Sequence, residues 1–153
     1  MHADHAPAGR FEGLEHRFAL RVYFEDTDLT AIVYHANYLR YMERARSDML
    51  ERAGIDQRAA FEAGEGAYAV RDIRVRYRAP ARLGEELIVV SRLVALRAAS
   101  VHIQQRVMRG ETILAEAEVE AAFVSSSGRP RRQPPEWVAA FEPLIWPKIE
   151  KES

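Results

Sequence analysis

One long amphipathic segment, followed by strand patterns, most constrains the fold of this chain. Between Asn37 and Ala53, apolar residues recur every three or four positions and charged residues fill the opposite side. The apolar positions are Leu39, Met42, Ala45, Met49 and Ala53. Asn37 is expected to cap the start of this helix and Gly54 to end it. The segment therefore predicts a helix about 26 Å long.

Most of the remaining pattern is typical of strands. Apolar and polar residues alternate, or apolar runs occur, within 17–24, 72–78, 87–96, 101–107 and 115–123. The cleanest alternation is that of 115–123, where Glu116, Glu118 and Glu120 take every second position. Because the last strands are joined by short connections, they must pair antiparallel. The sequence predicts an α+β domain in which one long helix is wrapped by a curved antiparallel sheet of about five strands.

Composition limits the partners and the compartment. The chain of 153 residues carries 22 Lys and Arg against 23 Asp and Glu, which argues against bulk binding of nucleic acid. It has no Cys, which excludes disulfides, thiolate zinc sites and a Cys nucleophile. With no signal-peptide pattern and no long apolar run, we expect a cytoplasmic location and no membrane span. We expect a flexible tail at 1–15, one domain at 16–132 and a C-terminal extension at 133–153.

Three acidic residues, Glu25, Asp26 and Asp28, lie just before the predicted helix. Their ordinary role would be that of a solvated turn, since acidic side chains are favoured near the start of a helix. A calcium loop beginning at Asp26 would need Gly and Glu at positions that Ala31 and Asn37 occupy. We therefore expect no metal site here.

The segment from Tyr23 to Arg46, YFEDTDLTAIVYHANYLRYMERAR, resembles the opening motif of the hotdog-fold thioesterases. It is most similar to the YbgC-like acyl-CoA thioesterases associated with the Tol–Pal system, a branch of the 4-hydroxybenzoyl-CoA thioesterase type. A second block at Val70–Val89, VRDIRVRYRAPARLGEELIV, resembles the same family. The likeness extends from about residue 17 to 132, and the order of strand, helix and four strands agrees with it.

This resemblance implies an acyl-CoA thioesterase, which hydrolyses a thioester to free coenzyme A and a carboxylic acid. The family's catalytic carboxylate falls on Asp28, acting either as a nucleophile or as a general base for water. His35 would lie at the start of the helix, where a backbone N–H can stabilise an oxyanion. The N–H of Ala69 would be a second donor. No cofactor is implied, because coenzyme A enters as part of the substrate.

Other residues are candidates for substrate binding. Tyr34 and Asn37 lie near the helix start and would line an acyl pocket, although aromatic residues there commonly serve helix packing. Arg76 and Arg129 would meet the phosphates of coenzyme A, because guanidinium groups suit phosphate. A solvated strand face for Arg76 and a mobile segment for Arg129 are the alternatives. The basic loop around Arg129 would also suit an acidic acyl carrier protein.

One stretch departs from the family pattern. Between the acid and the VYH run the family often has small residues, commonly Gly-Gly, whereas this chain has Leu29-Thr30-Ala31-Ile32. Gly permits backbone angles that Thr and Ala resist. A differently shaped loop and a narrower acyl pocket are therefore expectations for this chain.

Two other functions stay open. One is a non-hydrolytic hotdog module that binds an acyl group or an acyl carrier protein. The other is a hotdog hydratase or dehydratase. Those enzymes carry a catalytic His on a differently placed motif, which the VYHANY segment of this chain does not resemble. Active sites of the family commonly lie between subunits, so the resemblance implies a homodimer or homotetramer. The edge strands of an open sheet, which need covering, give the same expectation.

Overall fold

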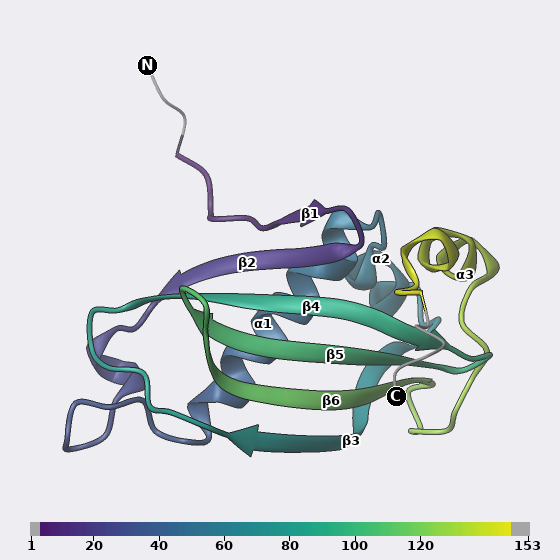
Figure 1. Ribbon diagram of the computed structural model, residues 1–153. Helices are drawn as coiled ribbons and strands as arrows, with labels where there is room; N and C mark the ends of the chain where they lie inside the picture. The colour runs from purple at the N-terminus through teal and green to yellow at the C-terminus, as the bar shows by residue number, and fades with distance from the viewer. Residues whose placement is uncertain (1–3, 148–153) are drawn as a thin grey trace.

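The sheet is antiparallel throughout and has six strands. In the computed structural model, which describes residues 4–147, they follow the order β1-β2-β4-β5-β6-β3 (Figure 1). Their bounds are β1 (Arg10–Glu12), β2 (Glu15–Arg21), β3 (Ala67–Tyr77), β4 (Glu86–Leu96), β5 (Ser100–Arg109) and β6 (Thr112–Val124). The predicted count of about five strands was low by one. The missed strand is β1, whose three residues are too few to show a period and lie within the stretch expected to be a tail.

The long helix α1 (Asn37–Arg52) lies across one face of the sheet (Figure 1). Met42 and Ala45 on its apolar side are fully buried, as are Leu87 and Val89 on the facing side of β4. Burial of each large apolar side chain contributes roughly 1.5–3 kcal/mol. This arrangement confirms the predicted α+β class.

The ends of α1 agree only in part with the sequence analysis. Gly54 follows the last turn with a φ of 89°, as expected for a helix stop. Asn37, however, is the first helical residue rather than the cap, which is Ala36. The side-chain amide of Asn37 donates instead to Oδ1 of Asp26 at 2.8 Å, a hydrogen bond to a charged acceptor that ties the start of the helix to the acidic segment before it.

Two short helices complete the fold, α2 (Gln57–Glu62) and α3 (Pro135–Phe141), with single turns η1 (Phe24–Asp26) and η2 (Glu142–Leu144). Trp137 of α3 is buried against the rings of Tyr68 and Phe123, with centroids 5.7 and 5.3 Å away. Residues 1–3 of the expected tail and 148–153 of the expected extension lie outside the described residues. No helix within 4–147 has the length and apolar character to cross a bilayer.

The two edges of the sheet differ in length. On one side the edge strand is β1, with three residues, and on the other it is β3, with eleven. The face turned away from α1 is charged, and Arg74 and Arg76 of β3 stand opposite Glu118 and Glu116 of β6. Opposite charges in such cross-strand pairs support the register.

Candidate active site

The loop of residues 27–36 connects η1 to α1 at one end of the sheet (Figure 1). Thr27 and Val33 pair as an isolated antiparallel bridge, and the N–H of Asp28 donates to the carbonyl of Ile32 at 2.9 Å. A second bridge joins Ile32 to Arg82. The loop is thus a tight turn anchored to the segment that leads into β4.

Ala31, at the tip of this turn, has a φ of 63°. It is the single non-glycine residue within 4–147 with a positive φ. Its N–H donates to the carbonyl of Asp28 at 3.2 Å, and its own carbonyl accepts from Leu83 at 3.0 Å. Left-handed backbone costs an L-residue about 1–2 kcal/mol. The strain therefore lies in the stretch where this sequence departs from the small residues of the family pattern.

The three acidic residues before α1 have different environments. Asp26 is buried, and its two carboxylate oxygens accept from the amide of Asn37 and from the N–H of Tyr23 at 2.8 and 2.9 Å. Glu25 and Asp28 are exposed. Asp26 is therefore committed to joining η1 to α1, and Asp28 is the carboxylate of this loop that is open to a substrate.

The carboxylate of Asp28 is held by one neighbour in sequence. Its Oδ1 accepts from the N–H of Thr30 at 2.8 Å and from the Thr30 hydroxyl at 2.7 Å. These bonds hold the pKa of the Asp28 carboxyl below its usual range, and the bond from the Thr30 hydroxyl has a larger effect than the bond from the Thr30 N–H. Within 4–147, no hydrogen bond or ion pair reaches Oδ2. One oxygen is fixed and the other is free for chemistry.

His35 lies immediately before the cap of α1. The N–H of Asn37, the first residue of the helix, donates to the carbonyl of Tyr34 at 2.8 Å. The N–H groups of His35 and Ala36, which precede the helix, have no acceptor within residues 4–147. The carbonyl of His35 accepts from the Tyr77 hydroxyl at 2.9 Å. Free N–H groups beside the positive end of a helix are suited to an anionic oxygen.

The structure brings four of the predicted site residues together and leaves three apart. Asp28, Tyr34, His35 and Asn37 share the loop or the helix start, and the rings of Tyr34 and His35 lie 4.5 Å apart. The candidates that lie elsewhere are Ala69, Arg76 and Arg129.

Ala69 is near the start of β3, eight residues or about 26 Å of strand from Tyr77. It borders a cavity of about 370 Å³ between α1 and the sheet. Arg76 is on the charged outer face of the sheet, opposite Glu116. Arg129 is exposed in the turn after β6, where its N–H donates to the Ser125 hydroxyl at 3.3 Å.

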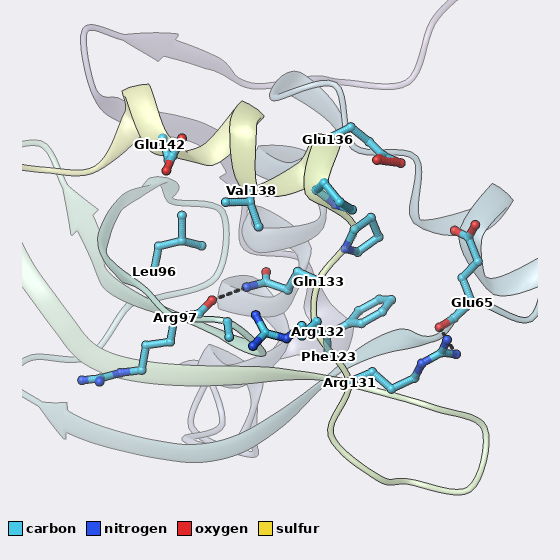
Figure 2. Close-up of a pocket in the computed structure, with 13 residues that line it drawn as sticks. Glu65, Leu96, Arg97, Phe123, Arg131, Arg132, Gln133, Glu136, Val138 and Glu142 are labelled. Carbon is cyan, nitrogen blue, oxygen red and sulfur yellow. Dashed lines mark hydrogen bonds between the residues drawn. The ribbon is translucent and has the colours of Figure 1, made fainter.

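A groove of about 800 Å³ lies at the other end of the sheet, where β4 and β6 end and α3 begins (Figure 2). Since β4 spans about 33 Å, this groove is far from Asp28 of the same chain. Arg97, Arg131 and Arg132 line it (Figure 2). Arg131 donates to the carbonyl of Glu65 at 2.7 Å, whereas Arg97 and Arg132 form no ion pair within the described residues.

Sequence reasoning missed three residues of these two regions. Thr30 was treated only as a departure from the family pattern, although a hydroxyl two residues after an acid is a recognised turn signal. Tyr77 and Arg97 reach their positions through strand pairing and a strand connection, for which the local pattern gives no signal. No three His, Asp or Glu side chains of residues 4–147 form a group able to hold a metal ion.

Comparison with known proteins gives one consistent result. The sequence profile of the thioesterase-like superfamily matches residues 22–141. The acyl-CoA thioester hydrolase YbgC of Escherichia coli O6:H1 is 40% identical over 128 residues, which cover 82% of this chain and 95% of that protein. The acyl-CoA thioesterase YbgC of Haemophilus influenzae is 35% identical, covering 83% and 94%. The crystal structure of a probable thioesterase from Bartonella henselae superposes with a TM-score of 0.74 at 34% identity, covering 78% of this chain and 99% of that one.

Proposed function

The chain belongs to the thioesterase-like superfamily and is a thioester hydrolase, and from this premise we propose that it hydrolyses acyl-CoA with Asp28 as the reacting carboxylate. The observation that carries the proposal is that one loop holds both a carboxylate with one unbonded oxygen and N–H groups without an acceptor among the described residues. Oδ2 of Asp28 and the N–H of His35 have no partner within residues 4–147. Acyl transfer needs these two elements, a reacting oxygen and a donor for the oxyanion.

The proposed reaction has two possible routes with the same groups. In one, Oδ2 attacks the thioester carbonyl, the C–S bond breaks, and water then hydrolyses the acyl-Asp28 anhydride. In the other, Asp28 takes a proton from water, and the hydroxide attacks the carbonyl. Coenzyme A leaves as the thiolate in both. The N–H of His35 would hold the oxyanion, a contribution of roughly 3–4 kcal/mol. The N–H of Ala69 lies about 26 Å of strand from Tyr77 and could be the second donor only from a second copy of the chain. The proposal requires no metal or separate cofactor.

Replacing the carboxylate tests the proposal. We expect Asp28→Asn to lower kcat for release of free thiol from hexanoyl-CoA by roughly 10²–10⁴-fold, while the far-ultraviolet circular dichroism stays unchanged. Glu25→Gln is the matched control, since it removes the charge of an exposed acid in the same region. Full activity in the Asp28 variant would refute the assignment.

We further propose that the groove lined by Arg97 and Arg132 binds the phosphates of coenzyme A, and that exposed Arg129, two residues before groove-lining Arg131, adds to the positive field. Arg76, which faces Glu116, is the weaker candidate for this role. We expect Arg132→Gln to raise KM for acyl-CoA several-fold with little change in kcat, and the effect to shrink at high salt. Arg58→Gln in α2, which also removes an exposed guanidinium, is the control.

The distance between groove and loop supports a site shared by two chains. A groove at one end of the sheet can serve Asp28 at the other end only if a second copy brings its groove to that loop. We therefore propose a homodimer, or a homotetramer built from dimers. Asp28 is exposed in the single chain, which also fits a site that a partner completes.

Complementation between two variants tests this arrangement. Co-expressed chains carrying Asp28→Asn or Arg132→Gln would form mixed dimers in which one of two sites is intact. With random pairing, about a quarter of all sites are intact, and at low substrate concentration they add to the residual activity of the Arg132→Gln homodimers. Activity no higher than the mean of the two variants assayed separately would refute the shared site.

Two rival functions predict different products. A non-hydrolytic acyl or acyl-carrier-protein scaffold would bind thioesters without releasing thiol, and a hydratase or dehydratase would alter the acyl chain. A panel of acyl-CoA and acyl carrier protein thioesters, followed by thiol release and by mass spectrometry of the acyl group, distinguishes all three.

A further inference from the structure

Thr30 contributes two hydrogen-bond donors to one atom. Its hydroxyl and its N–H both donate to Oδ1 of Asp28, at 2.7 and 2.8 Å. Asp28 and Thr30 are both exposed, so neither burial nor packing fixes the carboxylate. Without these bonds, χ1 of Asp28 would have three staggered wells available and χ2 a broad range.

The hydroxyl of Thr30 is itself held in a rigid turn. The bridge between Thr27 and Val33 closes the turn, and the bridge between Ile32 and Arg82 anchors it. A donor on a fixed turn can select one orientation of a carboxylate, which a donor on a free side chain cannot.

We propose that Thr30 is a positioning residue, which holds Oδ1 of Asp28 so that Oδ2 faces the thioester as an ionised oxygen. This inference rests on the proposed function and deepens it. The bonds that fix the carboxylate also favour its charged form, because both donors interact with the anion better than with the acid. The lowered pKa of Asp28 agrees with this.

No charged side chain competes for this role. The ionisable residues on the segments around the turn, 23–27, 32–36 and 81–83, are Tyr23, Glu25, Asp26, Tyr34, His35 and Arg82. None of them forms a hydrogen bond or an ion pair with the Asp28 side chain within residues 4–147. The bonds from Thr30 are therefore the contacts through which the loop controls this carboxylate.

The test compares Thr30→Val with Thr30→Ser by the pH dependence of kcat/KM, with hexanoyl-CoA as substrate and loss of thioester absorbance as the signal. Val keeps the branched shape and the N–H but lacks the hydroxyl. We expect the acid limb of the profile to move to higher pH in Thr30→Val, and the plateau of kcat to fall by roughly threefold or more as the χ1 wells become populated. Thr30→Ser should restore both.

Thr27→Val is the matched control, because the hydroxyl of Thr27 donates to the carbonyl of Phe24 at 2.7 Å and does not reach Asp28. Its acid limb should coincide with that of the wild type. If Thr30 only shaped the loop, Thr30→Val would lower activity equally at every pH and leave the acid limb in place, which would overturn the proposal.

A measurement without substrate separates this inference from the proposed function. The ¹³C carboxyl resonance of Asp28, followed through a pH titration, should show a higher pKa in Thr30→Val than in the wild type. An unchanged titration would overturn the role of Thr30. A shifted titration in a chain that releases thiol from no acyl-CoA would overturn the proposed function instead.

Discussion

Replacing Ala31 with Gly should stabilise this protein, although Gly ordinarily destabilises. The backbone of Ala31 is left-handed, with a φ of 63°, and hydrogen bonds at both its N–H and its carbonyl hold it there. Release of the left-handed strain should gain about 1–2 kcal/mol. The greater freedom of Gly in the unfolded chain should cost about 0.4–1 kcal/mol. The expected net gain in the free energy of unfolding is therefore about 0.8 kcal/mol, within bounds of about 0 and 1.6 kcal/mol.

Urea unfolding at one fixed protein concentration measures this gain. We expect the midpoint of Ala31→Gly to rise with no change in the m-value, and Tm to rise by roughly 2–4 °C per kcal/mol for a chain of this size. The matched control is Ala59→Gly in α2, an exposed Ala with helical backbone. That change should cost about 1 kcal/mol.

The comparison of the two variants decides the argument. If Ala31→Gly loses as much stability as Ala59→Gly, residue 31 is not left-handed in solution and the turn around Asp28 has another shape. The assignment of its hydrogen bonds to Thr30 would then also fail, since both depend on the same turn.

Further predictions concern the buried polar groups. His16 is fully buried, with Nε2 2.7 Å from Oδ2 of Asp48, and burial lowers the pKa of its imidazole. Below the ordinary pKa of about 6.5, the unfolded chain therefore binds a proton at His16 more readily than the folded chain does. We expect the free energy of unfolding to fall as the pH is lowered from about 7 to 5, and His16→Gln, which keeps an N–H for Asp48, to reduce that slope in urea titrations. Buried Gln133 accepts from the hydroxyl of Tyr68 and donates to the carbonyl of Arg97 at 2.7 Å. Gln133→Leu should therefore cost about 1–3 kcal/mol in the same assay, and no loss would show that water replaces the amide.

The fold was largely predictable because its main elements have strong periods. The alternation around Val119 and the apolar stripe around Met42 identify the sheet and its helix, and both side chains are buried as expected. What the local pattern could not give is pairing. Three-residue β1 exists because β2 offers it a partner, and the amide of Asn37 donates to the carboxylate of Asp26, which lies eleven residues earlier in the sequence, instead of capping α1.

The candidate site was predictable in chemistry and only partly in geometry. Asp28 and His35 lie in one continuous stretch, so a motif could indicate both. The roles of Ala69 and Arg129 depend on parts of the fold far from that stretch along the chain, and they stay predictions. The role of Thr30 was hidden because the sequence gives the spacing of a hydroxyl and an acid but not the turn that brings them together.

The unequal lengths of the two edge strands limit how copies of this protein can associate edge to edge. An exposed strand edge is a template for further strands, and eleven-residue β3 is by far the better template. Two copies joined along β3 would use both long edges and present only the three residues of β1 outward. Such a pair would leave no long edge unpaired, so strand-by-strand addition into a fibre would end at the second chain. The three-residue β1 edge would then be too short to template a further strand, which would prevent polymerisation.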